Sequence, residues 1–236
     1  MVKVEQNQSL VELALGRLRD DIVFAVYKPE QKLNIESLKK RYEMGGTPIR
    51  EALNRLVVVG LVEALPLKGF RVHSVALEEA EDLLMNRSWV ESLMIEQSLL
   101  QADDMWESLC IAALHRLKRC TQHEDFGSAE SLRKWVQLSN EFFAALYRLN
   151  GSLWLSKMYA DLYLHSMRYE YQSLLDCEDI PAVVEAQYLS YSELLEHCLE
   201  RELSKAQHSQ AAYMTNLTTL ISRSFQSEGA GLDTAE

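Results

Sequence analysis

The first quarter of the chain alternates apolar and polar positions with the period of an α-helix. Its first run of apolar residues keeps steps of three and four positions: Leu10, Ala14, Leu18, Ile22 and Ala25. Together with a capping-box pattern at Ser9 and Glu12, this run predicts a helix over residues 10–26. Pro29 breaks the pattern, and a second, short helix is expected to begin after Asn34.

The stretch from Thr47 to Gly60 predicts a third helix. Thr47 is suited to the N-cap and Pro48 to the first helical position, where its missing N–H group costs nothing. The apolar residues of this helix form one stripe: Ile49, Ala52, Leu53 and Leu56. The other positions are expected to form a short polar outer face: Thr47, Arg50, Glu51, Asn54 and Arg55.

Two short strands are predicted after the third helix, at residues 61–65 and 70–73. The residues between them, Pro66-Leu67-Lys68-Gly69, have the composition of a turn. Three helices followed by a hairpin is the element order of a winged helix-turn-helix domain. We place this domain at residues 1–76.

Beyond residue 76 the sequence predicts helix throughout. Proline occurs there only at Pro181, and glycine only at Gly127, Gly151 and in the last ten residues. Capping and breaking residues predict breaks in four places: 103–104, 124–128, 150–151 and 177–181. We therefore expect a mainly α fold, in which the winged helix is followed by an all-α bundle of about six helices over residues 77–226. Residues 227–236 lack apolar periodicity and predict a flexible tail.

The composition is that of an ordinary soluble globular protein. Of the 236 residues, 47% are hydrophobic and 25% are charged. The longest apolar stretch, near residues 56–67, is interrupted and is too short to span a bilayer, and the polar N-terminus does not resemble a signal peptide. We therefore expect a cytoplasmic protein without membrane contact. The four cysteines are scattered without a C-x-x-C pair, which favours reduced thiols over a zinc or disulfide framework.

Charge is divided unevenly along the chain. Residues 1–76 carry 12 basic and 9 acidic side chains, a net charge of +3, whereas residues 77–236 carry 12 and 26, a net charge of −14, which together give the overall −11. An acidic body repels DNA phosphates. Any contact with nucleic acid is therefore expected in the first third of the chain.

Three motifs in the first domain carry a family resemblance: Thr47-Pro48-Ile49-Arg50-Glu51-Ala52-Leu53, Gly60-Leu61-Val62 and Lys68-Gly69-Phe70-Arg71-Val72. They resemble the GntR family of bacterial transcriptional regulators over most of residues 10–75. The resemblance implies that the third helix enters the major groove of double-stranded DNA, with Arg50 as the leading candidate for base or phosphate contact. The DNA-binding residues expected from it are Thr47, Arg50, Asn54, Arg55, Lys68, Gly69 and Arg71. The alternative for each is a solvated surface residue.

The sequence departs from that family at the two positions before Thr47. The family usually has Ser-Arg immediately before Thr-Pro, and that arginine commonly contacts DNA, whereas this chain has Gly45-Gly46. A good bidentate base contact is worth about 1–3 kcal/mol, so a dimer that lacks two would lose roughly 2–6 kcal/mol. Weaker or otherwise compensated DNA affinity is expected.

The second domain resembles the all-helical effector domain of the FadR-type branch of the same family. Its Arg87-Ser88-Trp89-Val90-Glu91 looks like the branch's R-x-x-x-E pattern, and residues 141–151 look like its central helix. Many members hold a divalent metal with one Asp and three His. The corresponding positions here carry no such ligand: Ser139, Phe143, Tyr191 and Tyr213. We therefore expect neither a bound metal nor another cofactor.

A small-molecule effector is expected to bind in that second domain. Without a metal ion, binding of an organic acid would depend on Arg87. The effector-binding candidates are Arg87, Ser139, Asn140, Phe143, Tyr191 and Tyr213. The alternatives are that the aromatic residues only pack the bundle and that Arg87 forms an i,i+4 ion pair with Glu91.

The first helix of the second domain has more apolar residues than one face hides: Leu83, Leu84, Trp89, Leu93, Ile95 and Leu99. We expect a homodimer that reads a palindromic operator, acting as a repressor. One alternative is a ligand-independent regulator whose helical domain only dimerises. A metal-dependent helical enzyme is disfavoured, because the sequence shows no catalytic triad order, P-loop or metal-ligand spacing.

Overall fold

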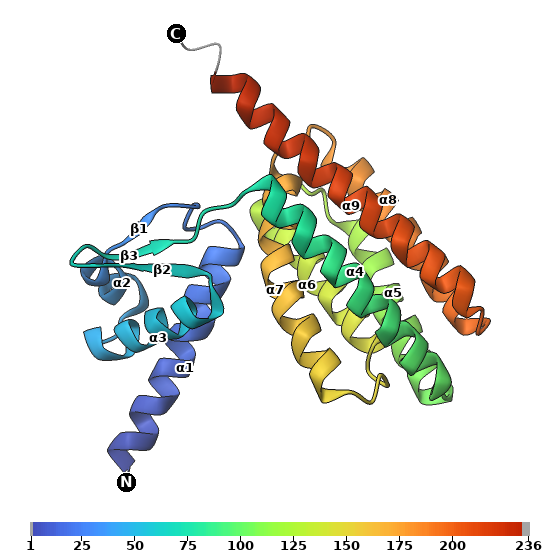
Figure 1. Ribbon diagram of the computed structural model, residues 1–236, viewed down its shortest axis with the longest axis horizontal. Helices are drawn as coiled ribbons and strands as arrows, with labels where there is room; N and C mark the ends of the chain where they lie inside the picture. Colours follow the sequence, from blue (N-terminus) through green and yellow to red (C-terminus); the bar gives the residue numbers. More distant parts are fainter. Residues whose placement is uncertain (1, 233–236) are drawn as a thin grey trace. The chain divides into compact units, whose positions relative to one another are not determined.

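The computed structural model of the chain describes residues 2–232, with side chains for residues 10–226. In that range it contains nine α-helices and three β-strands (Figure 1). They form two compact units, Met1–Ala76 and Leu77–Glu236. Across the described residues, no helix combines the length and apolar character needed to cross a membrane.

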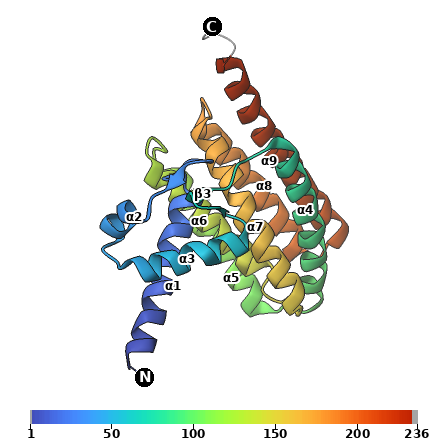
Figure 2. The same cartoon turned by 60° about the vertical axis from the view of Figure 1, so that its left-hand side comes forward.

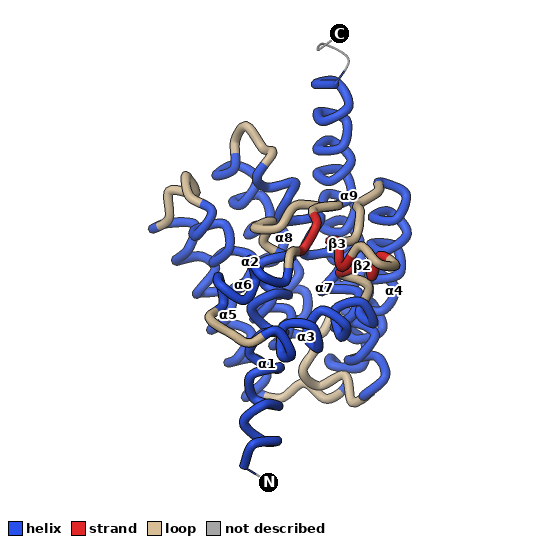
Figure 3. The backbone as a smooth tube through the Cα atoms, turned by 90° about the vertical axis from the view of Figure 1, so that its left-hand side faces the viewer, coloured by secondary structure: helices blue, strands red, loops and turns tan. Residues whose placement is uncertain are grey.

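The first unit is a winged helix. Its elements, in chain order, are α1 (Val2–Val23), β1 (Lys32–Leu33), α2 (Ile35–Tyr42), α3 (Gly46–Val59), β2 (Val62–Leu65) and β3 (Gly69–Val72). The strands form an antiparallel sheet in the order β1-β3-β2, drawn in red in Figure 3. Glu63 of β2 is paired with Arg71 of β3, which fixes the register of the hairpin.

The core of this unit lies between α1 and α3. Leu18 from α1 and Ile49 and Leu53 from α3 are fully buried there. Asn34 caps α2 by accepting a hydrogen bond of 3.1 Å from the Ser37 N–H group, and Gly60 ends α3 in a left-handed conformation at φ 86°. The predicted start of the second helix and end of the third are thus confirmed.

Several sequence-based boundaries are wrong in the first unit. Helix α1 begins at Val2, so Ser9 lies inside it and is not its N-cap. It ends at Val23 because Ala25 turns left-handed (φ 54°) and the Val26 N–H group bonds back to Asp21 at 2.8 Å. Strand β1 was missed, because two residues are too few to show a period.

The predicted start of the third helix is also wrong. The N-cap of α3 is Gly45, in an extended conformation, and Thr47 lies within the first turn. Pro48 is therefore the third helical residue, two positions later than expected, where an N–H group would still lack an intrahelical partner. The hairpin turn is one residue shorter than predicted, because Gly69 already pairs with Leu65.

The second unit is all α-helical, as predicted. Its helices are α4 (Leu77–Leu100), α5 (Asp104–His123), α6 (Ala129–Leu146), α7 (Leu153–Leu175), α8 (Ile180–Leu199) and α9 (Leu203–Leu232). Helix α9 packs against α4, α7 and α8, and α5 packs against α6 and α8 (Figure 2). The mainly α fold class is confirmed.

Four of the helices in this unit begin where a polar side chain caps them. Asp103, Ser128, Ser152 and Asp179 each accept a hydrogen bond from the N–H group three residues later. The predicted breaks at these points are confirmed. A further break, before α9, was not predicted. Helix α9 also continues to Leu232, into the segment where a flexible tail was expected, and residues 233–236 of that segment lie outside the described range.

Candidate functional site

The outer face of α3 is the first candidate site. Ile49, Ala52 and Leu53 are fully buried against the core, which turns Thr47, Arg50, Glu51 and Asn54 to solvent. In the part of the chain that the structure describes, Arg50 forms no ion pair or hydrogen bond. Its guanidinium group is thus available to bind an anion outside the protein.

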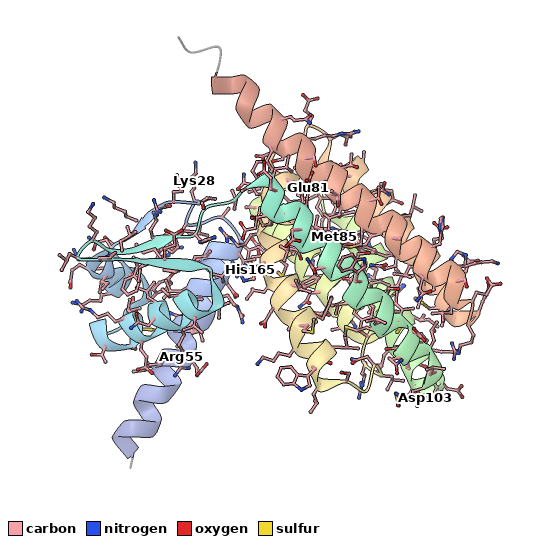
Figure 4. The ribbon with its side chains drawn as sticks, in the orientation of Figure 1. Lys28, Arg55, Glu81, Met85, Asp103 and His165 are labelled. Carbon is pink, nitrogen blue, oxygen red and sulfur yellow. The ribbon has the colours of Figure 1, made fainter. Side chains whose placement is uncertain are left out.

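Two other predicted cations on this unit already have acidic partners. Arg55, labelled on α3 in Figure 4, forms ion pairs with Glu12 and Glu51. Arg71 lies 2.7 Å from the Glu63 carboxylate across the β2–β3 ladder. These pairs reduce the positive charge that Arg55 and Arg71 present to a phosphate.

The wing is the turn between β2 and β3. Lys68 is exposed in this turn and has no ion-pair partner among the described residues. Gly69 has a φ of 88°, a conformation that favours glycine. On α2, Lys40 is likewise exposed and unpaired within the described range, a candidate that the sequence analysis missed, although its place in a basic run could have indicated it.

The two glycines before Thr47 leave room for side chains. A Cβ atom on Gly45 or Gly46 would meet its nearest described neighbours at 3.8 and 3.7 Å, which is ordinary van der Waals contact. Neither glycine needs a left-handed conformation. The missing arginine of the family motif is therefore a difference in sequence alone, because the backbone could carry it.

The second candidate site is a buried aromatic cluster in the helical unit. The rings of Phe143, Tyr191 and Tyr213 lie with centroids 5.0 to 5.6 Å apart, and the two tyrosine hydroxyls are 3.3 Å from each other. Ser139 is buried one turn before Phe143 on α6. The structure thus brings together the rings at three of the four positions that the family resemblance aligned with metal ligands, and the fourth, Ser139, is buried on the same helix as Phe143. Asn140, the other effector-binding candidate on this helix, is exposed.

These residues do not fit a divalent metal. Burial raises the pKa of Tyr191 and of Tyr213, so both phenols stay neutral, and Phe143 has no donor atom. Among the described residues, no three His, Cys, Asp or Glu side chains are grouped as metal ligands. The donor set therefore supports no chemistry through a bound cation.

Arg87 lies beside the aromatic cluster, with its side chain fully buried. Its Nε atom donates to Glu91 at 2.7 Å and its Nη1 atom donates to the Ser166 hydroxyl at 2.9 Å. The guanidinium carbon is 4.5 Å from the ring centre of Tyr163. Burial alone would lower the pKa of Arg87, but Glu91 and the surrounding tyrosines together more than offset this and hold the pKa above its usual value. The expected Arg87–Glu91 pair therefore exists, and it leaves one arginine nitrogen unused.

That nitrogen belongs to a group of buried donors without partners. In the described structure, Arg87 Nη2 and the hydroxyls of Tyr147, Tyr159 and Tyr163 make no hydrogen bond. The rings of Tyr147 and Tyr159 are 5.1 Å apart, and those of Tyr159 and Tyr163 are 5.4 Å apart. We call these four groups the donor cluster. An unpaired buried donor costs about 1–3 kcal/mol, so four of them favour an acceptor such as a carboxylate.

The sequence analysis did not identify the three tyrosines of the donor cluster. The i,i+4 spacing of Tyr159 and Tyr163, which places both on one face of α7, was the available signal. Tyr147 follows Phe143 by the same spacing on the central helix. The spacing shows a shared face, but it does not show that the face points at Arg87.

Two family models match the chain. "Bacterial regulatory proteins, gntR family" matches residues 10–72, and "FCD domain" matches residues 82–216. The HTH-type transcriptional regulator BphR of Paraburkholderia xenovorans is 33% identical over 71% of this chain and 69% of its own length. The HTH-type transcriptional repressor GlaR of Escherichia coli is 30% identical over 65% of this chain and 69% of its own length.

Solved structures share the fold. E. coli McbR/YncC superposes with a TM-score of 0.78 at 20% identity, covering 92% of this chain and 98% of its own. A GntR-type regulator from Rhodococcus sp. RHA1 gives a TM-score of 0.73 at 17% identity, covering 90% and 97%. The chain therefore belongs to the GntR family of bacterial regulatory proteins and is a transcriptional regulator with an FCD effector domain.

Proposed function

We propose that this regulator is a homodimeric repressor that binds a palindromic operator through α3 and the wing, and that releases or tightens it in response to a small organic acid. The observation that carries the proposal is the outer face of α3, where Arg50 is exposed and free of ion pairs among the described residues. A repressor role is supported by GlaR, which is named as a repressor. A regulator that binds chromosomal DNA acts in the cytoplasm, which is the location we propose for this protein.

The DNA-binding face is proposed to consist of groups with different tasks. Arg50 would reach base edges or phosphates, Asn54 lies one turn along the same face, and Thr47 would contact a phosphate. Lys68 would approach the backbone or the minor groove beside it. Arg55 and Arg71 would need to exchange an exposed ion pair for a phosphate, at a cost of about 0–1 kcal/mol each.

Dimerisation is supported by one exposed face of α4. Met85, Trp89, Leu93 and Leu100 recur along this helix with exposed fractions of 48%, 60%, 48% and 74%. Their spacing of four, four and seven residues keeps them on a single stripe, and Met85 is labelled in Figure 4. A row of exposed apolar residues on one helix face indicates a surface that another protein covers, and a second copy would pair α4 with α4 about a two-fold axis.

Effector binding is proposed to occur at the donor cluster. A carboxylate there would accept hydrogen bonds from Arg87 Nη2 and from the tyrosine hydroxyls, and no metal ion would be needed. Binding would change the packing of α4, α6 and α7, from which these groups come. This proposal places the acid at Arg87, as expected from the sequence, but with Tyr147, Tyr159 and Tyr163 in place of Asn140.

The DNA-binding proposal is tested by the variant Arg50→Ala. The probe is a set of duplexes selected from a random library by the native protein, and the measurement is the dissociation constant at fixed salt. Loss of a base contact of about 1–3 kcal/mol in each protomer should weaken binding at least tenfold. The matched control is Arg119→Ala, which removes the same charge from an exposed position on α5. Equal affinity of the Arg50→Ala variant and the control would refute the proposed interface.

The effector proposal is tested by the variant Tyr163→Phe. This change keeps the ring under Arg87 and removes a hydroxyl that has no partner in the described structure, so the melting temperature of the free protein should not fall. A screen of mono- and dicarboxylates first identifies an acid that raises the melting temperature of the native protein. The same acid should raise the melting temperature of Tyr163→Phe less, because a ligand stabilises a protein only as far as it binds the native state. Tyr188→Phe on α8 is the control. A screen without any shift would favour a helical unit that only dimerises.

A further inference from the structure

Helices α8 and α9 separate along part of their shared seam. They run antiparallel: His197 and Ser209 lie 2.9 Å apart near the connection, and the hydroxyls of Tyr191 and Tyr213 meet at 3.3 Å further along. Beyond that point α8 presents the small residues Ala186 and Ser190, and the seam opens into a groove of about 320 Å³. Figures 1 and 2 show the two helices side by side.

The groove has an apolar floor and one polar wall. Val183, Leu217 and Leu220 are among the apolar residues that line it. The polar wall is formed by Asn216 and Arg223 of α9, which are exposed and make no hydrogen bond or ion pair in the described part of the chain. Seven residues separate them, so they stand about 10 Å apart along the helix axis.

Other polar groups of the groove are already engaged. Gln187 accepts a hydrogen bond of 2.7 Å from the Trp135 indole and donates one of 3.1 Å to the buried Glu170. The Ser190 hydroxyl donates to the carbonyl of Ala186 at 3.1 Å. The groups that remain for a ligand are therefore the guanidinium of Arg223 and the amide of Asn216.

The charge of the groove is opposite to that of its surroundings. The unit that contains it has a net charge of −14, yet none of the described residues that line the groove is acidic, and its one charged side chain is Arg223. The nearby carboxylate of Asp176 bonds to Ser224 and Gln172. A positive group over an apolar floor, within an acidic surface, selects an anion that has an apolar body.

We propose that this groove binds a small carboxylic acid, with its carboxylate on Arg223 and its apolar body against Leu217 and Leu220. The site is separate from the donor cluster and does not depend on DNA binding. Tyr213 borders the groove and also belongs to the buried aromatic cluster. An acid in the groove therefore packs against a side chain of the core.

The test is calorimetric titration of the full chain with phenylacetate, benzoate and hexanoate, with phenylacetamide as the neutral counterpart of the first. We expect at least one of the three acids to bind. If phenylacetate binds, phenylacetamide should bind about tenfold more weakly or worse, because the amide cannot form the charged hydrogen bond with Arg223. Arg223→Gln should lower the affinity for the bound acid by the same factor. Ser190→Trp, which fills the groove, should abolish binding, and Arg119→Gln should bind as the native protein does.

Each other outcome overturns the inference. Unchanged affinity in Arg223→Gln and Ser190→Trp would place the acid elsewhere. If Tyr163→Phe alone removed binding, the acid would occupy the donor cluster, and the proposed function would stand while the groove site would fall. A change of oligomeric mass in Arg223→Gln, measured by sedimentation and without any acid binding, would make the groove a contact between copies. No heat from any of the acids at about 10 mM would also refute the site.

Discussion

Gly46 stands where the usual family motif carries an arginine. An arginine there would project from the first turn of α3, and the nearest neighbour of its Cβ atom among the described residues would be the Lys39 side chain, at 3.7 Å. We predict that Gly46→Arg binds the selected duplexes more tightly, by about 1–3 kcal/mol for each new contact, and with a steeper dependence on salt. The measurement is the dissociation constant over a range of salt concentrations.

The control for this prediction is Gly46→Ala. Alanine also replaces a flexible residue in the helix and so stabilises α3, but it adds no charge. If the arginine and alanine variants bound DNA equally, the gain would come from the helix and not from a contact, and the assignment of this turn to the DNA interface would be lost.

Arg55 and Arg71 are surface arginines whose ion pairs depend partly on residues far away in the sequence. Both lie on the surface that the motif predicts to bind DNA. The i,i+4 spacing of Glu51 and Arg55 indicates one of their ion pairs, but no local pattern indicates the pairs with Glu12 and Glu63. Glu12 is 43 positions away from Arg55 in the sequence. An ion pair between distant residues depends on how α1 packs against α3, which local sequence patterns do not contain.

At the scale of elements, helix ends with a dedicated capping residue were predictable. Asp103, Ser128 and Asp179 are polar residues that satisfy N–H groups within one turn, so the signal and its effect lie together in the sequence. The break between α8 and α9 has no such signal. Arg201 adopts a φ of 60° there, and its guanidinium bonds the carbonyl of Cys198 at 3.1 Å and Glu107 of α5 at 2.6 Å.

That break is therefore stabilised by a contact with another helix. Arg201 also lies over the ring of the buried Trp106, at 5.4 Å. A left-handed conformation at a residue other than glycine costs free energy, and the contacts with α5 offset that cost. Only the packed bundle could place α9 in its observed register, and the groove beside α8 follows from that register.

At the scale of the whole molecule, the exposed stripe on α4 predicts the oligomeric state. Trp89→Glu places a charge at the centre of this stripe, where burial between two copies would strongly disfavour it. We predict that the native protein sediments as a dimer and this variant as a monomer, with weaker binding to palindromic duplexes because two linked α3 helices bind better than one.

The matched control is Leu189→Glu on α8. Leu189 is also well exposed, at 57%, but it is isolated between Glu185 and Glu193 on its helix face. A single exposed apolar residue needs no partner. A dimer that survives Trp89→Glu, or that dissociates equally in both variants, would show that α4 is not the contact surface.

The sequence by itself determined the fold class and the family, because helical periods, caps and the spaced motifs around Arg50 and Gly69 are local patterns. The family resemblance also assigned Phe143, Tyr191 and Tyr213 to one candidate site. The tertiary structure decided which polar groups are free and which are paired. Tyr147, Tyr159 and Arg87 Nη2 come together from three segments, and the groove at Arg223 depends on helices that diverge. Both depend on side-chain packing between distant segments, which no periodic pattern specifies.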